Sequence, residues 1–192
     1  MIEIVLASSN AHKVEEINAI ANSHGINFVK VKDDFDPIED GETFEANSLI
    51  KAKEASKLMN AYALADDAGL CVDNLDGRPG IYSARYAPTQ AKKITKLLDE
   101  LKNTPDNQRT AHFVCAMTLT NSNGDIVHKT KGICNGKIAY APYGNGGFGY
   151  DPIFIVDGLN KTMAEFSLNE KNTLSHRAKA LLPMIEWIKA NL

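Results

Sequence analysis

Short apolar runs and helical patterns alternate along the first part of the chain. A nearly continuous apolar run over residues 2–7 predicts a strand that is buried on both faces. Apolar residues at three-to-four spacing over 14–21, closed by Gly25, predict a helix, and residues 26–31 predict a second strand. The polar residues between the first strand and the helix would then follow the carboxyl end of a strand, where open α/β sheets usually bind their ligands.

The remainder of the chain continues this mixture of strands, helices and turns. Acidic residues with a proline and a glycine over 32–42 predict a loop, after which Thr43 is expected to cap a helix that reaches Met59. The later predictions are strand pieces at 62–65 and 70–72 on either side of residues 66–69, a turn at 76–80, a helix over 89–102, a hairpin of strands 112–120 and 126–134, a glycine-rich loop at 142–151, a short strand at 152–156, and a final helix from about Leu174 that Pro183 should kink. This pattern predicts an α/β fold and, because no linker or repeat divides it, a single domain over residues 1–192.

Composition and charge narrow the class of protein. Of 192 residues, 44% are apolar and 23% are charged, as in an ordinary globular enzyme, and a chain of this length buries roughly 70% of its unfolded surface without a metal or disulfide. The 21 basic and 24 acidic residues leave a net charge of −3, which argues against a broadly basic surface and a polymeric nucleic acid as partner. The three cysteines form no CxxC pair, so neither a disulfide framework nor a structural zinc site is expected. The first residues carry no basic leader and no membrane-length apolar run, so we expect a cytoplasmic protein without a membrane partner.

A polar segment opens the first predicted helix. The free backbone N–H groups and the positive dipole end of a helix start commonly bind phosphate, and Lys13 adds a cation one turn further on. The alternative is structural: Ser9 or Asn10 would only cap the helix, and Lys13 would be solvated. The candidate phosphate-binding residues are Ser8, Ser9, Asn10, Ala11, His12 and Lys13.

Two adjacent aspartates, Asp66 and Asp67, interrupt the predicted strand pieces. Neighbouring side chains of a strand point to opposite sides, so only one carboxylate should face a given pocket. That carboxylate and an acidic residue from the loop at 36–42 would suit Mg²⁺, which takes few protein ligands and keeps waters and substrate phosphates. The alternative is a solvated acid in an Asx turn.

Three glycines reproduce the spacing GxGxxG without its structural context. A loop precedes Gly144, Gly146 and Gly149 and a predicted strand follows, whereas a dinucleotide-binding fingerprint needs a helix there. We interpret the segment as a loop whose backbone can approach a ligand, with Phe148 as a stacking surface and Asp151 as a hydrogen-bond acceptor. A mobile surface loop is the alternative.

A further group of basic residues lies near the end of the chain. Lys171, His176 and Arg177 fall within seven positions, just before an apolar helix, and would suit an anionic ligand. The alternative is an exposed basic helix face that carries a surface histidine.

Six segments of the chain together resemble one protein family. The similarity runs in order through SSNAHK, GETFEANSLIKA, ADDAGL, PGIYSARY, FGYDPIF and EKNTLSHR. The family is that of the inosine triphosphate pyrophosphatases, also described as Ham1-like or RdgB-like nonstandard purine nucleoside triphosphatases. The resemblance implies a homodimer and a mixed central sheet flanked by helices, with a nucleotide cleft between two lobes. The implied reaction is Mg²⁺-dependent hydrolysis of ITP, dITP and XTP to the nucleoside monophosphate and pyrophosphate.

The resemblance also implies roles for individual residues. Asp67 matches the general base and metal-associated acid of the family, and residues 8–13 match its triphosphate-binding loop. Lys171 matches a further phosphate contact, and Lys51 is a candidate for another. Base recognition is implied for Phe148, Gly149, Tyr150, Asp151, His176 and Arg177.

Three departures from the family pattern concern the metal and the phosphates. Relatives often carry two acids before the glycine that precedes the Thr-Phe pair. Here that stretch is Ile38-Glu39-Asp40-Gly41, so Glu39 is the candidate for the second Mg²⁺ ligand and Asp40 is the alternative. Ala46 stands where relatives often have a carboxylate. Ala68 offers only its backbone N–H to the substrate, where relatives also offer a hydroxyl.

A site of this kind must distinguish a 6-keto purine from ATP. Donors that bind the keto oxygen would face the amino group of adenine, and an unpaired buried donor is costly. Arg177, His176 and nearby backbone N–H groups are the candidate donors, with Phe148 stacking on the ring. Two other functions stay open, a Maf-like pyrophosphatase of other modified nucleotides and a nucleotide-binding module without turnover.

Overall fold

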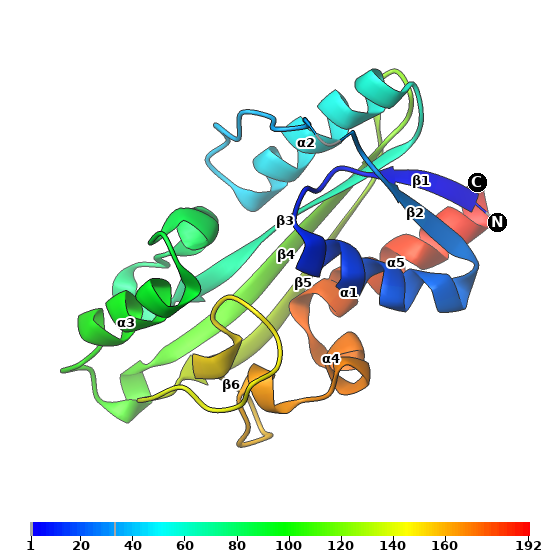
Figure 1. The fold of residues 1–192 in the computed structure, drawn as a ribbon. Helices are drawn as coiled ribbons and strands as arrows, with labels where there is room; N and C mark the ends of the chain where they lie inside the picture. Colours follow the sequence, from blue (N-terminus) through cyan, green and yellow to red (C-terminus); the bar gives the residue numbers. More distant parts are fainter. Residues whose placement is uncertain (1, 33) are drawn as a thin grey trace.

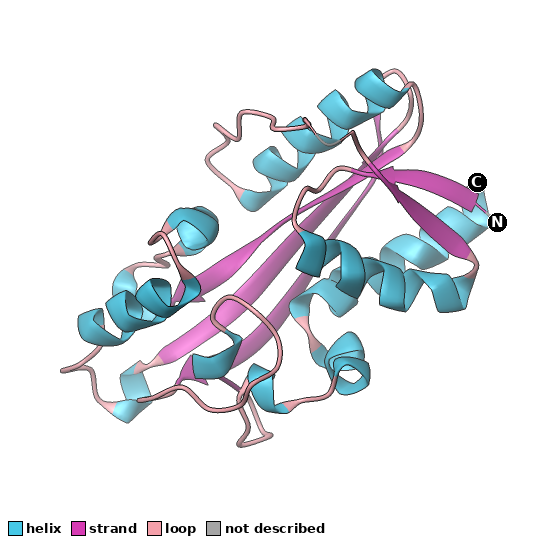
Figure 2. Ribbon diagram, viewed as in Figure 1, coloured by secondary structure: helices cyan, strands magenta, loops and turns pink. Residues whose placement is uncertain are grey.

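Six strands form one mixed sheet in the computed structural model, which describes residues 2–32 and 34–192. Their order across the sheet is β2-β1-β3-β4-β5-β6. β1 runs parallel to β2 and β3, whereas from β3 to β6 each strand is antiparallel to the next. In chain order the strands are β1 (Ile2–Leu6), β2 (Ile26–Lys30), β3 (Ala63–Val72), β4 (Thr110–Thr120), β5 (Ile126–Ile138) and β6 (Phe154–Val156). The predicted mixed sheet with flanking helices is confirmed (Figures 1 and 2).

The helices begin where the sequence offers caps. The Asn10 side chain accepts hydrogen bonds from the backbone N–H groups of His12 and Lys13, and Thr43 accepts one from Ala46. The α-helices are α1 (Ala11–Ala21), α2 (Phe44–Met59), α3 (Gln90–Glu100), α4 (Leu168–Leu174) and α5 (His176–Asn191). Short 3₁₀ helices are η1 (Asn22–His24), η2 (Asp73–Leu75), η3 (Gly80–Arg85), η4 (Asp106–Gln108), η5 (Asp151–Ile153) and η6 (Met163–Glu165). In the part of the chain that the structure describes, every helix is too short or too polar to cross a membrane.

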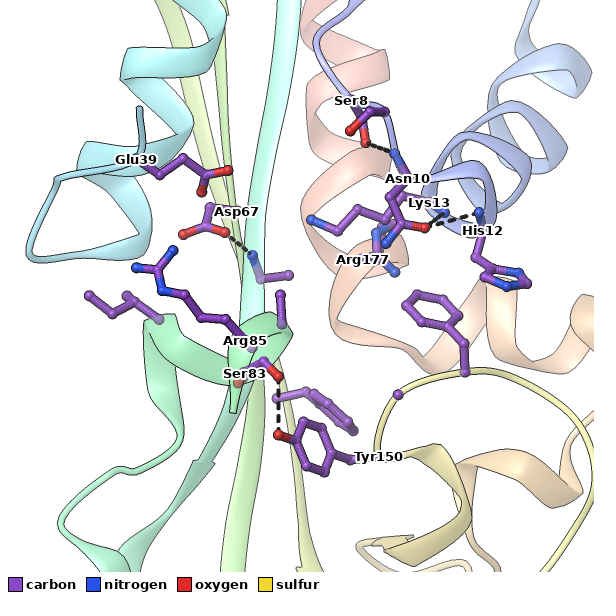
Figure 3. A pocket seen from close by; sticks show the side chains of 18 of the residues that line it. Ser8, Asn10, His12, Lys13, Glu39, Asp67, Ser83, Arg85, Tyr150 and Arg177 are labelled. Atoms are coloured by element: carbon purple, nitrogen blue, oxygen red, sulfur yellow. Dashed lines mark hydrogen bonds between the residues drawn. The ribbon is translucent and has the colours of Figure 1, made fainter. Parts of the chain in front are cut away.

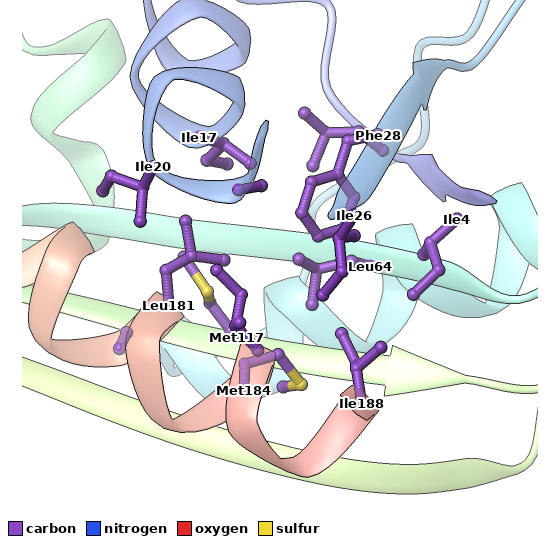
Figure 4. Close-up of a cluster of buried hydrophobic side chains, with 14 of the residues drawn as sticks. Ile4, Ile17, Ile20, Ile26, Phe28, Leu64, Met117, Leu181, Met184 and Ile188 are labelled. Atoms are coloured by element: carbon purple, nitrogen blue, oxygen red, sulfur yellow. The ribbon is translucent and has the colours of Figure 1, made fainter. Parts of the chain in front are cut away.

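Two large clusters of apolar side chains lie toward the two ends of β3. One packs α1 and α5 against the sheet and contains Leu64 of β3 with Met117 and Leu181 (Figure 4). The other joins α3 and β6 to the sheet and contains Leu70 of β3 with Phe113. Each fully buried side chain of this size stabilises the fold by about 1.5–3 kcal/mol. The two clusters therefore hold the ends of β3 firmly and leave its middle to carry polar residues.

Some elements differ from the sequence prediction. β3 is one continuous strand, Ala63–Val72, because each of its ten residues pairs with β4, and this ladder outweighs the low strand propensity of two aspartates. β5 continues to Ile138, beyond its predicted end. The predicted final helix is preceded by α4, which a capping box of Ser167 and Glu170 begins, and α5 runs through Pro183.

Candidate functional site

One cavity of about 420 Å³ lies beside the middle of β3. In Figure 3, Glu39 and Asp67 stand on one side of it and Asn10, Lys13 and Arg177 on the other. The sequence candidates that line it are Ser8, Ser9, Asn10, His12, Lys13, Glu39, Lys51, Asp67, Ala68, Phe148, Gly149, Tyr150, Asp151, Lys171, His176 and Arg177. The cavity thus gathers segments that are far apart along the chain.

Two sequence candidates fall outside the lining of this cavity. Ala11 is the first residue of α1, and its side chain is exposed. Asp40 is also exposed, whereas its neighbour Glu39 turns toward the cavity and contacts Lys51. The geometry therefore favours Glu39 over Asp40 as the second acid of the site.

The adjacent aspartates of β3 have different partners. Asp67 accepts hydrogen bonds from the Asn47 side-chain amide at 3.2 Å and from the backbone N–H of Ala68 at 3.1 Å. Burial raises the pKa of Asp67, although nearby lysines oppose this. Asp66 forms ion pairs with Lys13 at 3.0 Å and Arg177 at 3.4 Å. Although burial alone would raise the pKa of Asp66, these cations hold it far below its usual range.

Lys51 lies between two carboxylates that face the cavity. Its Nζ is 3.2 Å from Oε2 of Glu39 and 3.7 Å from Oδ1 of Asp67. Burial would lower the pKa of Lys51, but the negative charges of Asp67, Asp66 and Glu39 outweigh it and keep the ammonium charged. Two carboxylates around one cation form an oxygen-rich position that is suited to Mg²⁺, which takes one or two carboxylates and completes its shell with water and phosphate. In residues 2–32 and 34–192 no group of three His, Cys, Asp or Glu side chains is placed to hold a metal ion.

A buried acid on α1 joins the basic residues from the end of the chain. Glu16 forms ion pairs with both Lys171 and Arg177, and Lys171 also contacts Asp151 at 2.8 Å. Lys171 and Arg177 are only 4% and 2% exposed, so the alternative of an exposed basic helix face is wrong. The sequence prediction missed Glu16. The spacing could have revealed it, because Glu16 follows Lys13 by three residues and shares its helix face.

Aromatic rings lie at the other end of the cavity, together with His176 and Arg177. The Phe148 ring stacks on His12 with centroids 5.3 Å apart, and its backbone N–H binds the Asp151 carboxylate at 2.9 Å. His176 stacks on Phe113 and is buried. Burial and the adjacent Arg177 hold the pKa of His176 well below its usual value, so the imidazole is neutral. Nδ1 of His176 and Nε of Arg177 are buried without a hydrogen-bond partner in the described structure.

Comparison with known proteins agrees with the fold and with this arrangement of motifs. A model of the Ham1 family matches residues 4–187. The chain belongs to the Ham1 family. It is 47% identical to the dITP/XTP pyrophosphatase of Geobacillus kaustophilus, with 97% of this chain and 94% of the relative covered. It is 43% identical to the dITP/XTP pyrophosphatase of Bacillus subtilis, with 99% and 98% covered.

Solved structures of Ham1 proteins have the same architecture. The HAM1 protein of Coxiella burnetii superimposes with a TM-score of 0.87 at 39% identity, over 99% of this chain and all of that one. The Ham1 protein of Staphylococcus aureus gives a TM-score of 0.86 at 39% identity over the same shares. The family resemblance that the sequence motifs suggested is therefore confirmed.

This Ham1-family cavity has one wall that the sequence prediction did not assign. Ser83, Arg85, Gln90 and Lys93 line it from η3 and the start of α3. Gln90 accepts a hydrogen bond from the backbone N–H of Gly149 at 3.1 Å, which ties α3 to the glycine-rich loop. Two of these residues, Ser83 and Arg85, belong to the segment PGIYSARY, which is one of the six segments that resemble the family.

Proposed function

We propose that this Ham1-family protein is a nucleoside triphosphate pyrophosphatase that hydrolyses ITP, dITP and XTP to the monophosphate and pyrophosphate. The names of its relatives support this substrate class. The observation that carries the proposal is the composition of the cavity beside β3. A buried acid, Asp67, stands with paired cations near one end, and the Phe148 ring stands with His176 and Arg177 at the other. Such a protein would remove deaminated purines from the nucleotide pool.

The charges around the cavity support the use of Mg²⁺ with the substrate. Glu39 and Asp67 face the cavity with one cation, Lys51, between them. A bare triphosphate carries several negative charges and would be repelled by these two carboxylates, whereas a divalent ion offsets this repulsion. The other ion pairs at the cavity form a separate network of Lys13, Asp66, Arg177, Glu16, Lys171 and Asp151.

Asp67 and Glu39 are the residues that we assign to Mg²⁺. When bound, the ion would neutralise phosphate charge and polarise the phosphoryl group. Lys13 donates to phosphate oxygens, because its ammonium has three donors and its ion pair with Asp66 uses one. Lys171 pairs with Glu16 and Asp151, which use two of its three ammonium donors, so one donor is left for a phosphate oxygen. Asp67 accepts a proton from the attacking water, which adds to the α-phosphorus and releases pyrophosphate.

The other end of the cavity supports selection of a 6-keto purine. Phe148 offers a ring for stacking, and His176 and Arg177, which line the cavity beside it, offer N–H groups for the keto oxygen. Adenine would present a donor to these donors, and the unpaired contact would disfavour ATP. Ala68 and Gly149 also line the cavity, but their backbone N–H groups already donate to Asp67 and Gln90.

The cellular setting and assembly are also proposals. Cys71, Cys115 and Cys134 are all free thiols, which supports a reducing compartment such as the cytoplasm. The homodimer rests on the family resemblance. A purine nucleoside triphosphate is the proposed partner, and neither a polymeric nucleic acid nor a membrane is needed for it.

Pyrophosphate release from purified protein tests the proposed function. We expect fast release from ITP, dITP and XTP with Mg²⁺, little release from ATP, and loss of turnover when EDTA removes the metal. Equal rates on ITP and ATP would contradict the base selection. Preference for modified pyrimidine or methylated nucleotides would favour a Maf-like activity, and nucleotide binding without turnover would favour a sensing module.

A further inference from the structure

The 3₁₀ helix η3 is held rigidly against the strand that carries Asp67. The Ser83 hydroxyl donates to the Gly80 carbonyl at 2.6 Å and accepts from the backbone N–H of Leu70 at 2.9 Å. A Cβ at Gly69 would lie 2.6 Å from this hydroxyl, so η3 can approach β3 this closely only at a glycine. The last residue of η3, Arg85, therefore starts from a fixed position beside the cavity.

The side chain of Arg85 extends into the cavity toward the acids. Figure 3 shows its guanidinium reaching toward Asp67 and Glu39 from η3. The residue is exposed, and within the described residues no carboxylate forms an ion pair with it. Its contact with protein is the Tyr82 ring, whose centroid is 5.0 Å from Cζ.

Arg85 differs in this respect from the cations already assigned to the substrate. Lys13, Lys51, Lys171 and Arg177 each form at least one ion pair with a carboxylate in the structure. Those pairs limit how much net positive charge reaches a phosphate. An unpaired guanidinium can instead donate two parallel hydrogen bonds to phosphate oxygens, without first losing a carboxylate partner.

We propose that Arg85 binds the pyrophosphate part of the substrate and stabilises it as the leaving group. The assignment rests on the proposed function. As water oxygen bonds to the α-phosphorus, its proton passes to Asp67 and the bond to the bridging oxygen breaks, so the electron pair stays on pyrophosphate. Arg85 donates to these oxygens as their charge grows. Lys93 lines the same wall and adds positive charge there.

Direct binding of pyrophosphate tests this role without turnover. Calorimetric titration with sodium pyrophosphate in MgCl₂ should show affinity at least about tenfold weaker for Arg85→Ala than for the unaltered protein. Arg85→Lys keeps the charge but loses the paired donors, so an intermediate affinity is expected. Arg78→Ala is the matched control, because Arg78 precedes η3 and contacts Glu100 at 3.2 Å outside the cavity lining.

The same variants in steady-state assays separate this role from a structural one. Arg85→Ala should lower kcat and raise the KM for ITP and the inhibition constant of pyrophosphate, while inhibition by IMP stays unchanged. Equal pyrophosphate affinity in Arg85→Ala and the unaltered protein would overturn the proposal. An equal loss of pyrophosphate affinity in Arg78→Ala would also overturn it, as would the finding that the unaltered protein binds no pyrophosphate. Arg85-dependent pyrophosphate binding without ITP hydrolysis would instead refute the proposed reaction and leave Arg85 as a phosphate ligand.

Discussion

Asp66 and Asp67 are neighbours in β3 but belong to different parts of the site. The pleat of a strand sends adjacent side chains to opposite faces. Asp66 pairs with Lys13 and Arg177 through Oδ2 and does not line the cavity, whereas Asp67 faces Lys51 and the open cavity. A residue that accepts a proton from the attacking water must face the substrate, and Asp67 is the one of the two that has this position.

The substitution Asp67→Asn tests the role of that carboxylate. An amide of the same shape cannot accept the proton of the attacking water, so we expect kcat to fall by about 100-fold or more while KM changes only a few-fold. Steady-state pyrophosphate release from ITP measures both constants. Asp40→Asn is the matched control, since Asp40 is exposed and outside the cavity lining. Turnover close to that of the unaltered protein in Asp67→Asn would remove this residue from the chemistry.

At the scale of elements, the close contact between β3 and η3 shapes one wall of the cavity. Tyr150 reinforces it from the glycine-rich loop, because its hydroxyl donates to the Ser83 carbonyl at 3.1 Å. Gly69 allows the contact, since a Cβ there would lie 2.4 Å from the Gly80 carbonyl oxygen. Backbone atoms cannot move aside as a flexible side chain can, so the spacing of these elements depends on one small residue.

We expect Gly69→Ala to destabilise the protein by about 1–3 kcal/mol, because the added methyl group forces η3 away from β3. Urea denaturation measures this loss. The control is Gly77→Asn on the same connection, where φ is 79° and a Cβ would meet nothing within 4 Å. Asparagine tolerates that backbone conformation, so the control should cost much less. An unchanged free energy of unfolding in Gly69→Ala would show that η3 is not held as closely as the structure indicates.

For the whole molecule, a buried charge network joins segments from both ends of the chain. Glu16 and Lys13 come from α1, Asp66 from β3, Lys171 from α4 and Arg177 from α5. Removing one member would leave a buried charge without its partner, which typically costs several kcal/mol. The network therefore fixes how the helices meet at the cavity, and neutral His176 lies beside it.

The pH dependence of stability should report on His176. In the unfolded chain this imidazole takes up a proton as the pH falls below about 6.5, whereas its lowered pKa keeps it neutral in the folded state. The free energy of unfolding should therefore fall between pH 6.5 and 5. His176→Phe keeps a ring on Phe113 and cannot titrate, so it should reduce the slope by up to about 1.4 kcal/mol per pH unit.

Urea denaturation at several pH values measures these slopes. His128→Phe is the control, because His128 is a half-buried histidine that stacks on another ring, Trp187. If His176→Phe kept the slope of the unaltered protein, the histidine would take up its proton as readily in the folded state as in the unfolded chain, and its proposed role as a neutral donor to the purine would fail.

The sequence by itself determined most of the elements and the family. Apolar spacing placed the first strands and helices, and the cap at Thr43 is local chemistry that needs no distant partner. The family motifs identified most of the residues that line the cavity, because the order of the motifs along the chain can be recognised from the sequence alone. The local pattern failed at β3, where pairing with β4 outweighed the propensities of two aspartates.

Only the tertiary structure decided which charges meet. Glu16 and Arg177 are 161 residues apart, and no local pattern predicts that contact. It forms because burial of α1 and α5 against the sheet brings both side chains into a region with little water, where an unpaired charge is costly. The same packing left Arg85 without a carboxylate in the described structure, turned Glu39 inward and left Asp40 outside. Helical and strand periods report which face of an element is buried, but the partner across that face depends on how all the elements pack together.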